Sequence, residues 1–196
     1  MENNLSCIFC DIVKAKSPCH KVWEDDKHLA FLSIFPNTKG FTVVIPKQHY
    51  SSYAFDQDDG VLSELVIATK KVARLLDKAL DGVARTGMFF EGYGVDHLHS
   101  KLAPMHKTAE GSGFKPIEFK LDKFFERYEG YLSSHDHSRA NDKELSTLAA
   151  LIRSYDSHPW AKVNNLIQAG LIHHSLSKYV PNKLLNNNKA YTIVSF

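Results

Sequence analysis

The sequence lacks any long apolar run. Nothing in it approaches a membrane-spanning helix, which needs about 20 consecutive, mostly apolar residues. A secretory signal core is also missing, because the first apolar residues are only Leu5 and the pair Ile8 and Phe9. We therefore expect neither insertion into a membrane nor secretion.

Cysteine is scarce, and its count is odd. The three residues are Cys7, Cys10 and Cys19. An odd count argues against a framework of disulfide bonds, and so does the missing secretory signal. The expected compartment is the cytoplasm, where thiols stay reduced.

An excess of one charge sign is absent as well. The 24 lysines and arginines nearly balance the 22 acidic residues, which leaves a formal net charge of +2. No electrostatic surface for DNA is indicated, and we expect no nucleic-acid partner. The chain does have an apolar fraction of 43%, which is enough for a hydrophobic core. Its 196 residues fit one domain with an appendage, or two small domains.

The most informative stretch begins with two glycines. Gly92 and Gly94 precede an alternation in which His97, His99 and Lys101 take every second position. Side chains of an extended strand point to opposite faces in turn, so these three are expected on one face. Two imidazoles and an ammonium beside a glycine-rich turn suit the handling of phosphate. The alternative is an edge strand whose polar side chains face water.

Cys7 and Cys10 form a Cys-x-x-Cys pair, which brings two sulfurs close together. Thiolates at this spacing suit zinc, which usually takes four ligands in a structural site. No second such pair exists, so the remaining ligands would be histidines from elsewhere. A redox pair is the competing interpretation. We expect no helix after it to lower the pKa of a thiol, because Ser17 and Pro18 follow soon. Two buried thiols are the third interpretation.

The pattern of short strands and turns predicts an α+β fold with an antiparallel sheet. Strands are expected at 22–24, 28–32, 41–46 and 86–91, followed by the histidine strand. The clearest helix is expected from Asp58 to Leu80, where apolar residues recur at helical spacing. We expect its apolar stripe to pack on the sheet.

The composition changes in the second half of the chain. We expect one domain at 1–116 and a helical extension at 117–196. Helices are predicted at 141–155 and at 163–179, the second weakened by Gly170. The extension contains no informative motif.

Three segments resemble the histidine-triad (HIT) superfamily of nucleotide hydrolases and transferases. They read Cys-Ile-Phe-Cys-Asp-Ile-Val, Leu-Ala-Phe-Leu-Ser-Ile-Phe-Pro-Asn-Thr-Lys-Gly-Phe-Thr-Val-Val-Ile-Pro-Lys-Gln-His and Gly-Val-Asp-His-Leu-His-Ser-Lys-Leu-Ala-Pro. The match runs from about Cys7 to His106, in the family's order and spacing. It implies a HIT-like antiparallel meander sheet with a packed helix, plus C-terminal helices, and a homodimer joined through sheet and helix.

The family motif is His-x-His-x-His, and its middle histidine is the nucleophile. That position is His99 here, the first histidine is His97, and the third is replaced by Lys101. The acidic or amide residue that commonly holds the ribose falls at Ser33, and a further family histidine is replaced by Phe41. The nucleophile is retained, so the resemblance implies that the reaction class is retained.

The resemblance also implies a structural zinc ion, one per chain. Family members with the Cys-x-x-Cys pair often bind zinc through two cysteines, a histidine after a Pro-Lys segment and the first motif histidine. Carried over, these ligands are Cys7, Cys10, His49 and His97. His106 is the alternative fourth ligand.

The expected function is nucleotide hydrolysis through a covalent nucleotidyl–His99 intermediate. Expected substrates are dinucleoside polyphosphates or nucleoside phosphoramidates. Backbone N–H groups around Gly92 and Gly94 would stabilise phosphate oxygens, and Lys101 would add positive charge. The alternatives are a nucleotide-binding module with little turnover, a nucleotidyl transferase, and a zinc-stabilised interaction protein whose sheet is a dimer scaffold.

Overall fold

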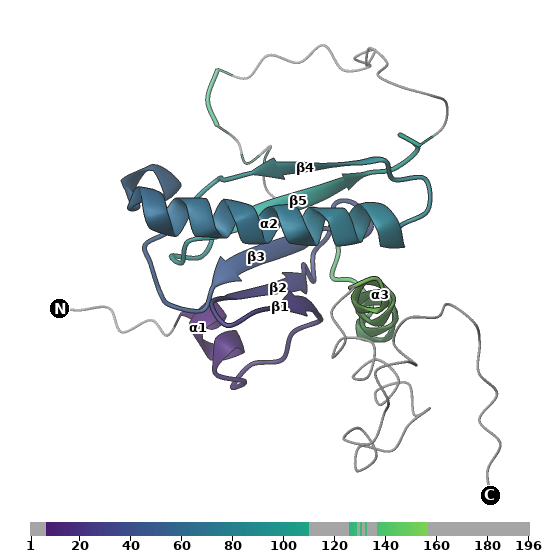
Figure 1. Ribbon diagram of the computed structural model, residues 1–196, viewed down its shortest axis with the longest axis horizontal. Helices are drawn as coiled ribbons and strands as arrows, with labels where there is room; N and C mark the ends of the chain where they lie inside the picture. The colour runs from purple at the N-terminus through teal and green to yellow at the C-terminus, as the bar shows by residue number, and fades with distance from the viewer. Residues whose placement is uncertain (1–6, 110–125, 129, 131, 133–136, 157–196) are drawn as a thin grey trace, which may run out of the picture.

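The computed structural model describes residues 7–109, 126–128, 130, 132 and 137–156, and a five-stranded antiparallel sheet forms its centre (Figure 1). The strands are β1 (Lys21–Glu24), β2 (His28–Leu32), β3 (Thr42–Pro46), β4 (Arg85–Phe89) and β5 (Ser100–Met105). The helices are α1 (Ile8–Val13), α2 (Asp59–Ala79) and α3 (Asp142–Ser154), with one 3-10 turn, η1 (Ala54–Asp56). The predicted α+β class is confirmed. The helix expected at 163–179 lies outside the described residues.

The strand order is β1-β2-β3-β5-β4. The first three strands form a meander, β5 lies next to β3, and β4 lies at the edge beyond β5. α2 carries the chain from β3 to the edge strand β4, and β5 returns to pair with β3. Lys101 on β5 therefore lies opposite Val43 on one side and Phe89 on the other. The alternative of an edge strand with polar side chains in water is wrong, because His97, His99 and Lys101 are 0%, 2% and 5% exposed.

The two faces of the sheet are covered by different helices. α2 packs the larger core on one face, with seven buried residues at helical spacing: Leu65, Ala68, Thr69, Val72, Leu75, Leu76 and Ala79. The short helix α1 covers the other face, where Phe9, Ile12 and Val13 pack on a smaller cluster that includes Phe31 and Val43. The helix expected from Asp58 to Leu80 is α2, and it is confirmed to within one residue at each end. No helix in the described part of the chain combines the length and apolarity needed to cross a bilayer.

α3 belongs to the same core as the sheet. Leu145, Ala149 and Ile152 join the larger core cluster, and α3 contacts β1 and α2. The helix begins as expected, because the Asn141 side chain accepts hydrogen bonds from two N–H groups of its first turn, at 2.9 and 3.3 Å.

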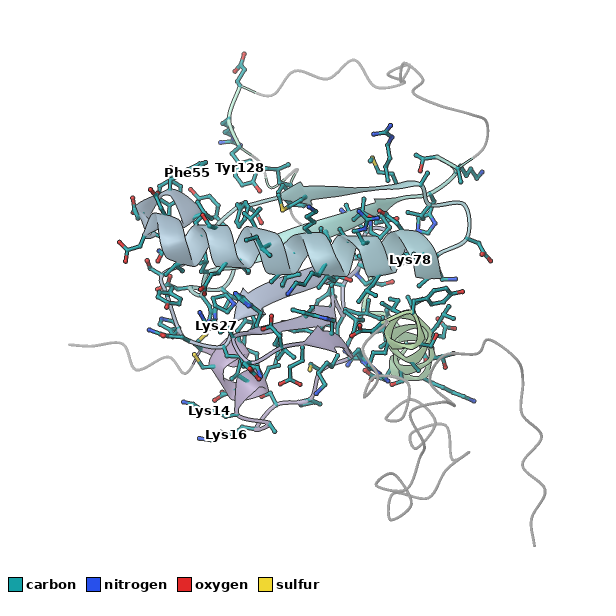
Figure 2. All side chains as sticks on the ribbon, viewed as in Figure 1. Lys14, Lys16, Lys27, Phe55, Lys78 and Tyr128 are labelled. Carbon is teal, nitrogen blue, oxygen red and sulfur yellow. The ribbon has the colours of Figure 1, made fainter. Side chains whose placement is uncertain are left out.

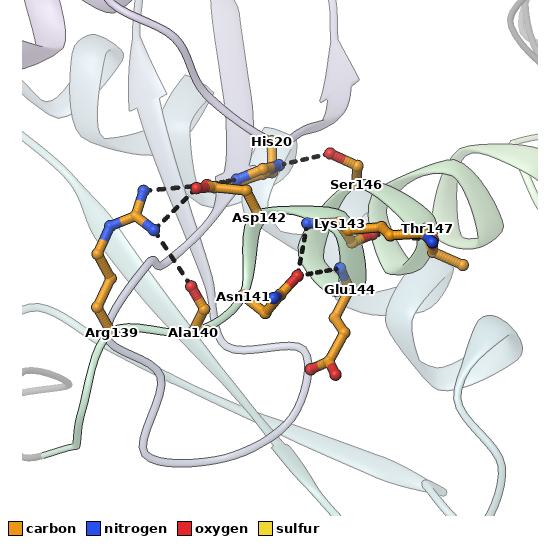
Figure 3. A network of polar contacts seen from close by, with 9 residues as sticks. All are labelled: His20, Arg139, Ala140, Asn141, Asp142, Lys143, Glu144, Ser146 and Thr147. Carbon is orange, nitrogen blue, oxygen red and sulfur yellow. Dashed lines mark hydrogen bonds and ion pairs between the residues drawn. The ribbon is translucent and has the colours of Figure 1, made fainter.

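A polar network on the surface joins α3 to the chain before β1 (Figure 3). His20 Nε2 lies 2.9 Å from Asp142 Oδ1, and His20 Nδ1 lies 3.2 Å from Ser146 Oγ. Arg139 donates to both carboxylate oxygens of Asp142, at 2.9 and 3.0 Å. The Arg139 guanidinium, helped by His20, lowers the pKa of Asp142 to about 2. These contacts fix the start of α3 against the first half of the chain.

Candidate functional site

The histidines lie just ahead of β5 rather than within it. The strand begins at Ser100, although the sequence predicted a strand that includes both histidines. The alternation nevertheless holds. Ser100 turns toward α2, where its hydroxyl lies 2.6 Å from that of Thr69. His97 and His99 turn toward α1, where both rings contact Phe9. The interior Ser100–Thr69 bond thus fixes which face the histidines occupy.

The glycine-rich loop before the histidines is tied to the segment after β3. Gly92 and Gly94 have φ values of +76° and +89°, a region that favours glycine. The Ser52 hydroxyl donates to the Gly92 carbonyl at 2.9 Å, and the Ser52 N–H donates to Asp96 Oδ1 at 2.9 Å. The turn is therefore held by its neighbours in the conformation that only glycine adopts readily.

A group of metal donors lies beside the first motif histidine. The donor atoms of Cys7, Cys10, His49 and His97 all lie within 4.8 Å of one another. His97 Nδ1 is 3.5 Å from the Cys7 sulfur and 3.6 Å from the Cys10 sulfur. Cys10 Sγ is also 3.4 Å from His49 Nδ1. The chain thus brings together the N-terminal helix, the end of β3 and the histidine segment.

The spacing of these donors fits a tetrahedral ion. Zinc bonds of about 2.3 Å to sulfur and about 2.05 Å to nitrogen place neighbouring tetrahedral ligands roughly 3.5 Å apart. The three sulfur–nitrogen distances match that value. Without an ion, burial and the neighbouring Cys7 sulfur raise the pKa of the Cys10 thiol, which disfavours the thiolate. A bound cation would reverse this effect.

His97 is oriented for such a role by the main chain. Its Nε2 lies 2.9 Å from the Pro46 carbonyl oxygen and donates its proton there, because a carbonyl can only accept. Nδ1 is then the unprotonated nitrogen, and it faces the two sulfurs. Burial lowers the pKa of the His97 imidazole, which keeps the ring neutral, as a ligand must be.

The Cys-x-x-Cys pair does begin a helix, contrary to the sequence-based expectation. Cys7 caps α1 and Cys10 lies within it, so both thiols sit at the start of a six-residue helix. The helix forms because its apolar residues Phe9, Ile12 and Val13 pack on the sheet face. Tertiary packing thus stabilises a helix too short to persist alone.

The two ring nitrogens of His99 differ in their roles. Its Nδ1 lies 2.7 Å from the His97 main-chain oxygen, so Nδ1 carries the proton and Nε2 carries the lone pair. Burial lowers the pKa of the His99 imidazole, and the Lys101 charge acts in the same direction. The neutral ring is therefore favoured. A neutral imidazole with a free Nε2 is able to act as a nucleophile.

Lys101 lies on the same face and is paired. Its ammonium makes an ion pair with Glu91 Oε2, and the two side chains are 6% and 5% exposed. The other carboxylate oxygen of Glu91 accepts a hydrogen bond from the Tyr128 hydroxyl. The sequence reasoning missed Glu91 and Tyr128. Burial of Lys101 explains why it has such a partner, because a buried charge needs one.

Other candidate residues have local contacts. The Ser33 hydroxyl accepts from the Phe35 N–H at 3.2 Å, and the buried Phe41 ring contacts Phe89 edge-on. His106 lies past the far end of β5, where its Nε2 is 2.8 Å from the Lys39 carbonyl. Within the described residues, the donor group contains His97 and does not contain His106.

Comparisons with known proteins agree with this fold. The family model for the HIT domain matches residues 14–107. An uncharacterized HIT-like protein of Borreliella burgdorferi is 34% identical over 129 residues, which cover 61% of this chain and 91% of that protein. The adenosine 5'-monophosphoramidase hnt1 of Schizosaccharomyces pombe is 34% identical over 109 residues, covering 56% of this chain and 81% of the relative.

Among solved structures, a Zn-bound histidine triad family protein from Mycobacterium smegmatis superposes with a TM-score of 0.56 at 21% identity. The match covers 78% of this chain and 97% of that one, and it supports the fold. The sheet, its packed helix and the inward-facing histidines define a protein of the histidine-triad class. The chain belongs to the HIT family. Hydrolase activity is therefore indicated at the level of the family.

Proposed function

We propose that this protein hydrolyses nucleotides at the α-phosphorus through a covalent nucleotidyl–His99 intermediate. The observation that carries the proposal is the 2.7 Å contact between His99 Nδ1 and the His97 carbonyl, which leaves Nε2 free. Burial supports it, because it favours the neutral, nucleophilic form of the ring. Membership of a family with phosphoramidase-named relatives supports the same reaction class.

The reaction has two displacements. His99 Nε2 attacks the α-phosphorus, a phosphorus–nitrogen bond forms, and the leaving group departs with the electrons of its bond to phosphorus. Water then attacks the same phosphorus. The phosphorus–nitrogen bond breaks, its electrons return to Nε2, and a nucleoside monophosphate and a proton are released.

The residues around His99 are proposed to hold the substrate. Backbone N–H groups at Gly92 and Gly94 would bind non-bridging phosphate oxygens, because glycine leaves the approach unobstructed. Lys101 would supply positive charge on the same face. Ser33, at the end of β2, is the proposed ribose contact.

The proposed substrates are nucleoside phosphoramidates or dinucleoside polyphosphates. Similarity to the yeast relative, an adenosine 5'-monophosphoramidase, favours the first class. Two other outcomes remain as alternatives. A nucleotidyl transferase would pass the group from His99 to an acceptor other than water. A nucleotide-binding module would form the complex with little turnover.

Zinc is the proposed ion for the donor group of Cys7, Cys10, His49 and His97. Two thiolates and two imidazoles form a ligand set that zinc commonly uses. The similar mycobacterial protein, a Zn-bound family member, supports the choice. When bound, the ion would hold the N-terminal helix on the histidine segment and stabilise the fold.

We also propose that the protein is a cytoplasmic homodimer with a HIT domain at 1–116 and an extension at 117–196. Among the described residues, the edge strand β4 pairs with β5 alone, which favours pairing with a second copy along its other side. Ile67 on α2 and Met88 on β4 are 56% and 47% exposed, as expected for apolar residues at an interface. Sedimentation as a monomer at micromolar concentration would contradict the dimer.

Intact-protein mass spectrometry tests the reaction. The protein is mixed with an adenosine phosphoramidate or with diadenosine tetraphosphate and quenched rapidly. We expect one adenylyl group per chain in the wild type and none in His99→Ala. His106→Ala is the matched control, because this exposed histidine lies past the other end of β5. Full turnover in His99→Ala would overturn the proposal.

A further inference from the structure

A buried ion pair next to the nucleophile is held by a residue beyond the HIT domain match. Lys101 pairs with one carboxylate oxygen of Glu91, and the Tyr128 hydroxyl donates to the other. The family model ends at residue 107, so Tyr128 lies outside it. Figure 2 shows Tyr128 beside the end of β4, close to where β5 begins.

The hydroxyl of Tyr128 completes the set of partners that this ion pair needs. Burying two opposite charges is favourable only when the geometry is good and the remaining lone pairs are also hydrogen-bonded. Burial by itself raises the pKa of the Glu91 carboxyl. Hydrogen bonds from Lys101 and Tyr128 outweigh burial, and the pKa lies below its ordinary value. Glu91 therefore stays ionised and keeps its hold on the lysine.

Tyr128 is itself fixed at two points. Its hydroxyl binds Glu91, and its ring stacks on Tyr93, with centroids 5.8 Å apart and planes at 25°. Tyr93 stands between the two loop glycines. Tyr128 is thus attached to the glycine loop and to the ion pair at the same place.

Lys101 and His99 lie two residues apart on one face. Two residues of extended chain span about 6.6 Å between Cα atoms, so the two side chains leave the same face of the chain as nearest neighbours. A phosphoryl group attacked by His99 would develop negative charge between them. A fixed cation stabilises such charge more than a mobile one, because it needs no reorganisation during the reaction.

We propose that Tyr128 is a positioning residue which, through Glu91, holds the Lys101 ammonium beside His99 for contact with the transferred phosphoryl group. The inference rests on the proposed nucleotidyl transfer to His99. It makes the chain beyond the HIT domain part of the catalytic arrangement.

The test is the rate of nucleotidyl–His99 formation in Tyr128→Phe. This variant keeps the ring on Tyr93 and removes only the hydroxyl. The hydroxyl donates to an ionised carboxylate, and a hydrogen bond to a charged group contributes about 1.5–3 kcal/mol, so we expect the maximal rate to fall by roughly 10- to 150-fold. The nucleotide concentration that gives half the maximal rate should be unchanged, because the effect acts on the transition state. Rates are measured by rapid quench and intact mass, with diadenosine tetraphosphate as the probe.

Tyr93→Phe is the matched control, because it removes the hydroxyl of the other ring in the same stack. Its maximal rate should equal that of the wild type. Equal rates in Tyr128→Phe and Tyr93→Phe would overturn the inference while leaving the nucleophile in place. So would a change confined to the half-saturating concentration. If the wild type forms no adduct at all, the proposed function itself fails.

Discussion

The two ends of the segment from His97 to Lys101 are held by different kinds of interaction. At the His97 end, sulfur and nitrogen donors from three parts of the chain lie within 4.8 Å of one another. At the Lys101 end, opposite charges pair directly and a tyrosine completes the contact. His99 lies between them. The His97 end has donor atoms that suit a metal cation, whereas the Lys101 end contains a cationic side chain that is already paired.

The metal donors and the ion pair are expected to stabilise the fold in different ways. The donor group at His97 is expected to respond to chelators, since a chelator competes with these ligands for a metal. The pair at Lys101 is expected to respond to substitution, since removal of one partner leaves a buried charge. Each end can therefore be disturbed without direct change to the other.

The largest effect is expected at the Lys101 end. Lys101→Met leaves the Glu91 carboxylate buried without its partner, which should lower the free energy of unfolding by about 3–5 kcal/mol. The double variant Lys101→Met with Glu91→Gln removes both charges and should recover much of that loss. Urea unfolding measures both. Equal stability of Lys101→Met and the wild type would show that the pair contributes nothing.

Metal removal tests the His97 end. An ion present at 100 to 1,000 times its dissociation constant adds about 2.7–4.1 kcal/mol to the free energy of unfolding. We expect a strong chelator to lower the melting temperature of the wild type and of Cys19→Ser. It should have little effect on Cys10→Ser, which lacks one of the four donors. Elemental analysis should find about one zinc per chain; none in protein purified without chelator would contradict the site.

A pH profile tests the protonation state of the His99 imidazole, which lies between the two ends. Burial, and then the Lys101 charge, lower the pKa of His99 below the ordinary 6.5, so the neutral form persists as the solution becomes more acidic. Adduct formation should therefore stay near its plateau down through pH 6.5 and decline only below it. Neutralising Lys101 should move the decline to higher pH. A half-maximal rate at or above pH 6.5 in the wild type would contradict this assignment.

The smallest effect is expected far from the site, at the start of α3. Asn141→Ala removes the side-chain cap of that helix and should lower the free energy of unfolding by about 1 kcal/mol. Lys143→Ala, in the same first turn, has no cap to remove and should change it far less. Thermal unfolding of the two variants gives the comparison.

The sequence predicted most of the strands and both longer helices, because hydrophobic spacing determines them. It did not predict α1, whose six residues are stabilised only by packing on the sheet. It placed the histidines inside a strand. In the structure the His97 N–H donates to the Val95 carbonyl and the Leu98 N–H donates to the Tyr50 carbonyl, and the strand begins later, at Ser100. The four metal donors were predicted from the family resemblance. Glu91 and Tyr128 were missed, because a pairing between residues 37 positions apart leaves no local pattern.

The acceptor that orients His99 is the main-chain oxygen of residue 97, and every amino acid provides one. A change of the side chain at this position, even one that abolished metal binding, would leave that oxygen in the chain. The nucleophile and the metal donors are therefore able to evolve separately. A descendant of this sequence that lost the metal donors would still keep the proton on His99 Nδ1.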